Sequence, residues 1–214
     1  MNPSVDLALI RKYDKTGPRY TSYPTALHFT ESFNREKYLE SIAQSQLQKD
    51  PISLYFHIPY CDTLCYFCGC NMIISKDRNR IQRYEDYLQK EIQLLQQHLN
   101  IEREVLQLHW GGGTPTYLLP EQITRLIRSI RKHFKISNSA EMSCEIDPRE
   151  LKREHLVALR EGGFNRISMG VQDFNETVQN AVNRLQPEAL TRQVAQWVRE
   201  LNYHSLNLDL IYGL

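Results

Sequence analysis

The sequence predicts an α/β fold in which parallel strands with outer helices form a partial (βα) barrel, truncated after about five strands. Three observations lead to this prediction. After Pro51, short apolar strands alternate with amphipathic helices, as in a parallel sheet with helical crossovers. Each strand is apolar at every second residue only, and polar or glycine-rich residues gather where strands end. The element order alone also fits an open doubly wound sheet.

Composition excludes several classes of protein. The chain has 214 residues, 41% of them hydrophobic, and a formal net charge of +1. It can hold one or two domains, and its mixed charges give no basic surplus for nucleic acid. No stretch is apolar enough to span a bilayer, and the start, MNPSVDLALIRKY, lacks the features of a signal peptide. We therefore expect a cytoplasmic protein with no nucleic-acid partner and no membrane span.

The first fifty residues read as irregular, apart from one helix over 35–48. The segment GPRYTSYPTALHF places glycine and prolines among tyrosines, which favours a loop with contact residues. We expect two parts, an N-terminal arm over 1–50 and a barrel domain over 51–214 that is incomplete at its C-terminus. Arg19 and the tyrosines Tyr13, Tyr20 and Tyr23 are candidate contact residues of this arm, or the arm could simply pack on the barrel.

Five strands and four helical regions are expected after residue 51. The strands are SLYFHIP, VLQLHW, AEMSCEI, RISMGVQ and SLNLDLIYG. The helices have apolar residues at helical spacing and cover 83–99, 120–134, 153–163 and 175–201, the last in two pieces divided near Pro187.

The alternation within the strands separates two faces. The expected covered face carries Leu54, Phe56, Ile58, Leu106, Leu108, Trp110, Met142, Cys144, Ile146, Ile167, Met169, Val171, Leu206, Leu208 and Leu210. The other face is polar and includes His57 and His109, for which we expect hydrogen bonds. A parallel sheet covered on both sides should be apolar on both, so the polar face predicts a cavity that holds a ligand. The alternative is a sheet with one solvated face.

Chemistry-bearing residues follow the carboxyl ends of these strands. Cysteines follow the first strand, GGGTP follows the second, and acidic or amide side chains end the other three. Active sites form at this edge in parallel α/β proteins. We therefore expect the functional site at this edge.

The segment CDTLCYFCGC contains four of the five cysteines. A structural zinc site normally takes its ligands from two pairs of residues that are separated in the sequence, and no second pair accompanies this segment. Three thiolates at C-x₃-C-x₂-C, which are Cys61, Cys65 and Cys68, suit three corners of a cubane iron–sulfur cluster and leave one iron open. A zinc loop and incidental buried thiols are the alternatives. We expect Cys144 to be a core residue, and Cys70 is not expected to bind the cluster.

This cysteine motif, with Phe67 before its last cysteine, resembles the signature of the radical S-adenosylmethionine enzymes. The resemblance implies a [4Fe-4S] cluster, S-adenosylmethionine, an electron donor for the cluster and a 5′-deoxyadenosyl radical. Seven segments also resemble the oxygen-independent coproporphyrinogen III oxidases: GPRYTSYPTA, YFHIPYCDTLCYFCGCN, LHWGGGTPTYL, EIDPRE, GFNRISMGVQDFN, VNR and NLDLIYGL. That family implies oxidative decarboxylation of two propionates of coproporphyrinogen III to vinyl groups, which gives protoporphyrinogen IX in haem biosynthesis.

The resemblance also implies two S-adenosylmethionine molecules. Tyr55, Gly112 and Glu145 would contact the first molecule. The second would be contacted by Phe67, Gly113, Thr114, Gln172, Arg184 and Asp209.

Two other classes remain open. A related protein that binds or traffics haem would lack the decarboxylation, and a zinc-stabilised interaction module would lack iron. Members of the oxidase family continue beyond the equivalent of DLIYGL, so we expect this chain to be an N-terminal fragment that does not turn over alone. We expect the protein to be a monomer with a porphyrinogen substrate.

Overall fold

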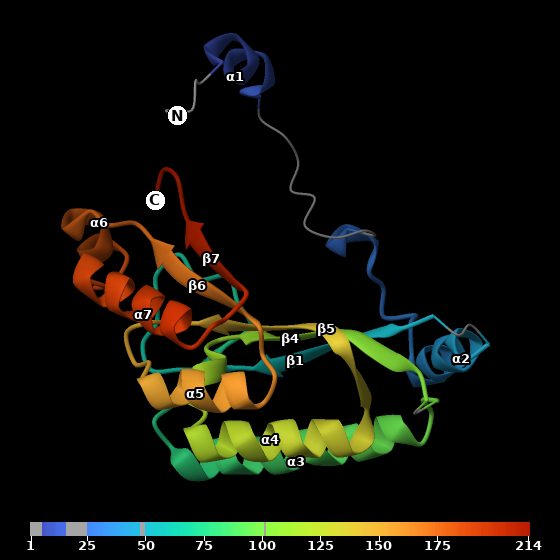
Figure 1. Cartoon of the computed structure of the whole chain (residues 1–214). Helices are drawn as coiled ribbons and strands as arrows, with labels where there is room; N and C mark the ends of the chain where they lie inside the picture. Colours follow the sequence, from blue (N-terminus) through green and yellow to red (C-terminus); the bar gives the residue numbers. More distant parts are fainter. Residues whose placement is uncertain (1–5, 16–24, 48–49, 101) are drawn as a thin grey trace. The chain divides into compact units, whose positions relative to one another are not determined.

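The computed structural model describes residues 6–15, 25–47, 50–100 and 102–214 (Figure 1). The chain divides into two compact units, 1–41 and 42–214. The first contains the helix α1 (Leu7–Tyr13) and the 3₁₀ helix η1 (Ala26–His28), and α2 (Arg35–Ser45) crosses the boundary between units. Helix α1 was not predicted; it begins at Asp6, whose carboxylate accepts hydrogen bonds from the amides of Ala8 and Leu9. Arg19, Tyr20 and Tyr23 lie outside the described residues.

The second unit is built on one parallel sheet. Its five strands are β1 (Ile52–Ile58), β4 (Glu104–Gly112), β5 (Lys135–Ile146), β6 (Arg166–Gln172) and β7 (Ser205–Leu210). They lie side by side in the order of the sequence, and every neighbouring pair is parallel. The predicted partial barrel with five parallel strands is therefore confirmed.

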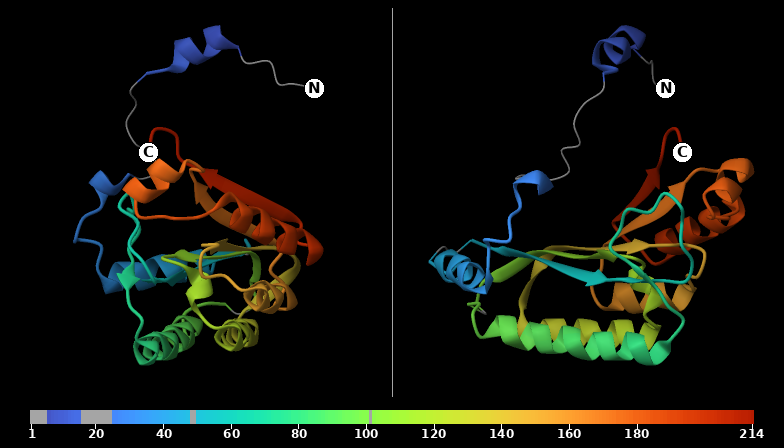
Figure 2. Two further views of the ribbon diagram at one scale, coloured as in Figure 1. Left: turned by 90° about the vertical axis from the view of Figure 1, so that its left-hand side faces the viewer. Right: turned by 180° about the vertical axis from the view of Figure 1, so that it is seen from behind.

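Helices connect successive strands, as predicted. They are α3 (Arg78–Gln96), α4 (Pro120–His133), α5 (Arg153–Glu161), α6 (Glu176–Ala181) and α7 (Glu188–Glu200). Figures 1 and 2 show α3, α4 and α5 together against one face of the sheet, with α7 beside β6 and β7. Helix α3 begins five residues before the predicted start because the Asp77 carboxylate accepts hydrogen bonds from the amides of Asn79 and Arg80. None of the described helices is both long and apolar enough to cross a membrane.

The core lies between the helices and the apolar face of the sheet. Trp110 of β4 is fully buried, and its ring meets the edge of Phe164, with centroids 5.0 Å apart. Cys144 is also fully buried within this core, as predicted. Packing against a single face leaves the other face free to line a site.

The face assignment was wrong for Leu106, and two leucines of β7 are not buried, contrary to expectation. Leu106 is 39% exposed and Val105 is buried instead, because Leu106 is an extra residue where β4 pairs with β1: Ile52 pairs with Val105 and Ser53 pairs with Gln107. A shift of one residue moves a side chain to the other face. Leu208 pairs with the buried Met169 and so lies on the predicted face, but Leu208 and Leu210 are exposed, because β7 is an edge strand of the sheet and only part of its length is covered by described residues.

A buried carboxylate joins α3 to α4. Glu85 is 1% exposed, and Arg125 donates to both of its oxygens, with distances of 2.7 Å from Nε and 2.6 Å from Nη2. Gln122 donates to Oε2 at 3.1 Å. The carboxylate has thus exchanged its hydration for three donors from the next helix, which fixes how the two helices pack.

Replacing Glu85 with alanine should therefore destabilise the protein. Gln122 would keep a buried donor without a partner, whereas Arg125 is half exposed and can rehydrate. We expect Glu85→Ala to lower the free energy of unfolding by about 2–3 kcal/mol, measured by denaturant titration. Glu91→Ala, on the exposed side of the same helix, is the control and should cost less than about 0.5 kcal/mol. Equal effects for the two variants would contradict this role of Glu85.

Candidate functional site

The cysteine loop begins and ends at a short parallel pair of strands at the edge of the sheet. After β1 the chain forms β2 (Tyr60–Cys61), which pairs in parallel with β3 (Ile73–Ile74). The Ile73 amide donates to the Pro59 carbonyl at 2.6 Å, and the Ser75 amide donates to the Cys61 carbonyl at 3.3 Å. The ladder therefore closes a loop that contains Cys65, Cys68 and Cys70. All five cysteines of the chain are free thiols.

The far side of this loop is bound by the residues that follow α6. The Tyr66 amide donates to the Val182 carbonyl at 3.0 Å, and the Asn183 side chain donates to the Leu64 carbonyl at 2.8 Å. Asn183 has a positive φ of 54°, a conformation that asparagine tolerates better than most residues. These two hydrogen bonds hold the backbone on both sides of Cys65.

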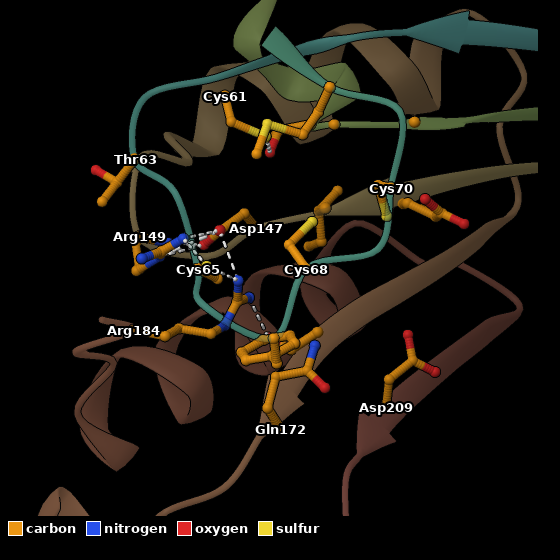
Figure 3. A pocket seen from close by; sticks show the side chains of 18 of the residues that line it. Cys61, Thr63, Cys65, Cys68, Cys70, Asp147, Arg149, Gln172, Arg184 and Asp209 are labelled. Atoms are coloured by element: carbon orange, nitrogen blue, oxygen red, sulfur yellow. Dashed lines mark hydrogen bonds and ion pairs between the residues drawn. The ribbon is translucent and has the colours of Figure 1, made fainter. Parts of the chain in front are cut away.

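A cavity of about 260 Å³ opens beside the loop. Figure 3 shows cysteines on one side of it and polar side chains from the ends of β5, β6 and β7 around the rest. Its lining includes all but one of the residues that the sequence predicted for the site: Cys61, Cys65, Phe67, Cys68, Gly112, Gly113, Thr114, Glu145, Gln172, Arg184 and Asp209. Cys70 also lines it.

Tyr55 is the predicted residue that does not line this cavity. Its ring stacks on that of His109 with centroids 5.8 Å apart, and its hydroxyl lies 3.0 Å from Nδ1 of His57. His109 in turn lies 3.2 Å from Glu145 and 2.6 Å from Ser143. Both histidines are therefore hydrogen-bonded, as expected, and Tyr55 belongs to a polar row that reaches the cavity at Glu145.

Asp209 is held at the opposite side of the cavity. Its carboxylate accepts a hydrogen bond from Ser168 at 3.1 Å and another from Asn207 at 2.6 Å. These contacts orient its two oxygens. Such an acceptor is suited to ribose hydroxyls or to an amine.

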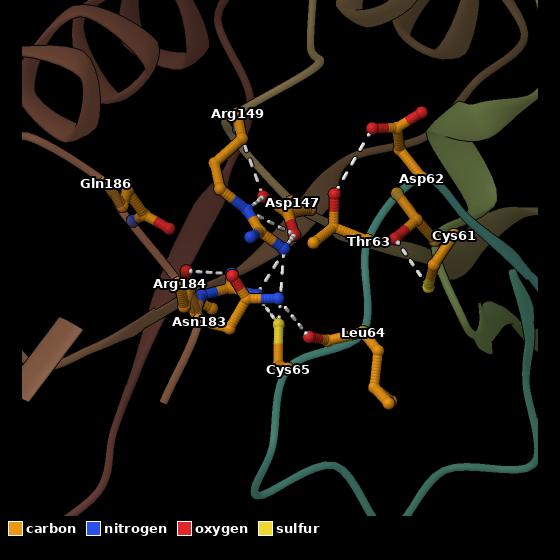
Figure 4. A network of polar contacts seen from close by, with 12 residues as sticks. Cys61, Asp62, Thr63, Leu64, Cys65, Asp147, Arg149, Asn183, Arg184 and Gln186 are labelled. Carbon is orange, nitrogen blue, oxygen red and sulfur yellow. Dashed lines mark hydrogen bonds and ion pairs between the residues drawn. The ribbon is translucent and has the colours of Figure 1, made fainter. Parts of the chain in front are cut away.

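A buried ion-pair network beneath the cysteine loop was not predicted in full (Figure 4). Asp147 follows β5, and its Oδ2 accepts from Arg149 Nη2 at 2.6 Å and from Arg184 Nη1 at 3.0 Å. Sequence reasoning placed Asp147 at this edge of the sheet and Arg184 in the site, but missed Arg149. A signal for Arg149 was available in the charged segment DPRE, which directly follows β5.

The contacts within this network favour the charged forms of Asp147 and Arg149. Burial by itself would raise the pKa of Asp147, but the hydrogen bonds from Arg149 and the charge of Arg184 outweigh it and lower that pKa below its ordinary value. Desolvation likewise works against the charge of Arg149, and Asp147 more than compensates, so the pKa of Arg149 is raised. Asp147 and Arg149 are therefore charged at neutral pH.

The donor set at the cavity suits an iron–sulfur cluster. Cys61, Cys65 and Cys68 come from one loop and line one cavity, and thiolates are the protein ligands of such clusters. Among the described residues, no three His, Cys, Asp or Glu side chains converge as ligands of one metal ion would. A cubane holds its thiolates on three different iron atoms, so that finding concerns a single-ion site and not a cluster.

Gly113 lies where a side chain would displace Cys61. A Cβ at this position would come within 2.7 Å of the Pro59 carbonyl oxygen and 2.9 Å of Cys61 Sγ. At Gly69, which belongs to the cysteine loop itself, a Cβ would meet nothing within 4 Å. The two glycines therefore form a matched pair for substitution.

We expect Gly113→Ala to reduce the iron bound per chain severalfold after anaerobic reconstitution with iron and sulfide, because the backbone near Pro59 and the Cys61 thiol must both shift. Gly69→Ala should bind iron like the unchanged protein. Iron and sulfide analysis with visible absorbance measures both. Full iron content in Gly113→Ala would refute the assignment of this geometry to cluster binding.

Known proteins resemble this chain in sequence and structure. It is 51% identical over 209 residues to the oxygen-independent coproporphyrinogen III oxidase of Escherichia coli strain K12, covering 98% of this chain and 45% of that protein. The enzyme of the same name from Pseudomonas aeruginosa is 48% identical over 211 residues, covering 98% and 46%. The solved structure of the Escherichia coli coproporphyrinogen III oxidase, described as a radical SAM enzyme, matches with a TM-score of 0.87 at 48% identity, over 99% of this chain and 46% of that one.

The chain thus spans about half the length of these relatives. The family model of the radical SAM superfamily matches residues 55–214, which begin within β1 and include the cysteine loop and the whole cavity lining. Since this match covers most of the chain, the chain belongs to the radical SAM superfamily.

Proposed function

We propose that this chain provides the cluster-binding and S-adenosylmethionine-binding part of an oxygen-independent coproporphyrinogen III oxidase. The observation that carries the proposal is the cavity shared by the three cysteines and the predicted S-adenosylmethionine-binding residues other than Tyr55, together with 51% identity to an enzyme of that name. The reaction is oxidative decarboxylation of two propionate side chains of coproporphyrinogen III to vinyl groups, giving protoporphyrinogen IX. Each conversion removes a hydrogen atom, which the radical takes, together with carbon dioxide and one electron, which passes to an external one-electron acceptor.

When bound, a [4Fe-4S] cluster and S-adenosylmethionine supply the radical that abstracts this hydrogen. The residues of this chain hold and orient them. Cys61, Cys65 and Cys68 would bind three irons, and an external electron donor would reduce the cluster. These three thiolates would leave one iron of the cluster without a protein ligand.

The site residues form two groups, one for each of two S-adenosylmethionine molecules. Tyr55, Gly112 and Glu145 lie on β1, β4 and β5, and we assign them to the first molecule. The second group lies around the cysteine loop and the ends of β4, β6 and β7: Phe67, Gly113, Thr114, Gln172, Arg184 and Asp209. The two groups adjoin at Gly112 and Gly113, but each has its own acceptor on a different strand, Glu145 on β5 and Asp209 on β7, and this supports two positions.

The first experiment tests the cluster and the reaction. The full-length protein, purified and reconstituted without oxygen, should bind about four irons per chain and convert coproporphyrinogen III to protoporphyrinogen IX in the presence of S-adenosylmethionine and an electron donor. Replacing Cys61, Cys65 and Cys68 with serine should abolish iron binding and product formation. Cys144→Ala, which changes a cysteine in the core away from the cavity, should keep the iron.

Two outcomes would refute this proposal. A protein that binds zinc and no iron would point to a zinc-stabilised module. An intact cluster with haem binding but no vinyl products would favour a haem-trafficking role.

The second experiment counts the bound S-adenosylmethionine. We expect the reconstituted protein to bind two molecules per cluster in equilibrium dialysis, and Gln172→Ala to weaken the second binding step with little effect on the first. Gln196→Ala, on the exposed side of α7, is the control and should leave both steps unchanged. A stoichiometry of one in the unchanged protein would contradict the second site.

A further inference from the structure

Two guanidinium groups contact the sulfur of Cys65. Arg149 Nη2 donates to Cys65 Sγ at 3.3 Å, and Arg184 Nη1 lies at 3.6 Å from the same atom. Cys65 is only 7% exposed. In the described part of the chain, Cys61 has a neutral partner instead, with its sulfur 3.4 Å from the Thr114 hydroxyl. The sulfur of Cys65 therefore has two positively charged neighbours, whereas the sulfur of Cys61 has a neutral hydroxyl.

Both guanidinium groups are fixed in place. Asp147 binds Arg149 through both carboxylate oxygens and binds Arg184 through Oδ2, and Arg184 also donates to the Gly170 carbonyl at 2.8 Å. The side chains of Arg149, Arg184 and Asp147 are 17%, 9% and 14% exposed. Buried charges that are already oriented act more strongly on a neighbouring atom than solvated ones. With one carboxylate between two guanidiniums, the network has a net positive charge.

The position of Cys65 relative to these donors is fixed by the backbone as well. Tyr66 and Leu64, on either side of it, are hydrogen-bonded to Val182 and Asn183, which directly precede Arg184. The sulfur and its donors are thus held by one continuous set of contacts (Figure 4). Hydrogen bonds to cysteine sulfur are among the factors that set the reduction potential of an iron–sulfur cluster.

We propose that Arg149 and Arg184, held by Asp147, are positioning residues that donate to the Cys65 sulfur and raise the reduction potential of the cluster. This inference rests on the proposed binding of that cluster by Cys61, Cys65 and Cys68. Reduction adds one electron from a low-potential one-electron donor and moves no proton, so the cluster and its thiolates become more negative. Positive donors stabilise the reduced form more than the oxidised form, which shifts the equilibrium toward reduction.

Arg149 is the residue to change, because Arg184 is also assigned to S-adenosylmethionine. The experiment is a redox titration of the reconstituted full-length protein without S-adenosylmethionine, followed by the paramagnetic signal of the reduced cluster. In Arg149→Gln the ratio of reduced to oxidised cluster at a fixed potential should fall about tenfold, equivalent to a shift of about 59 mV for a one-electron couple. Iron content should remain that of the unchanged protein. Arg149→Lys keeps the positive charge but loses the planar guanidinium group. It should lower the ratio of reduced to oxidised cluster by less than Arg149→Gln does.

Arg166→Gln is the matched control, because Arg166 forms an exposed ion pair with Glu141 outside the cavity lining. It should leave the potential unchanged. An unchanged potential with full iron content in Arg149→Gln, or lost iron with an unchanged potential in the remaining cluster, would overturn this inference alone. Should Arg149→Gln not fold, an unchanged potential in Arg149→Lys would do the same. Absence of iron from the unchanged protein would instead overturn the proposed function.

Discussion

The buried carboxylate of Asp147 is the contact on which the geometry of the site depends. It joins the segment after β5 to the segment after α6 through Arg149 and Arg184, and both arginines reach the cysteine loop at Cys65. A buried carboxylate is costly unless it is paired and hydrogen-bonded. Pairing with two guanidiniums meets that requirement and brings together segments that lie far apart in the sequence.

The sheet determines where this network can form. Its helices pack against one face, so the apolar residues of β4, β5 and β6 are buried on that side and the other face carries His109, Ser143 and Glu145. Because the strands are parallel, their carboxyl ends lie at one edge, where the loops after β1, β4, β5 and β6 meet. Residues of these loops line the cavity.

The cysteine loop has little regular structure, yet it is held at both ends. The ladder of β2 and β3 closes its base, and hydrogen bonds from Tyr66 and Asn183 hold its far side. Gly113 leaves room for the Cys61 thiol where a side chain would clash. A ligand loop held in this way places its thiols before any cofactor binds, which reduces the ordering cost of binding.

The sequence by itself determined the element order, the parallel sheet and the cysteine motif, because alternation, helical spacing and C-x₃-C-x₂-C are local patterns. The roles expected for the other site residues came from the resemblance to a known family and from no local pattern. Tertiary structure decided the rest. The exposure of Leu106 follows from a register shift between β1 and β4. The helix at Leu7–Tyr13 is different, because it rests on a local cap by Asp6 and none of the residues described in this helix is buried. Arg149 and Asn183 escaped prediction because their partners, Cys65 and Leu64, are 84 and 119 residues away, and a contact over such a separation exists only once the strands between them have paired.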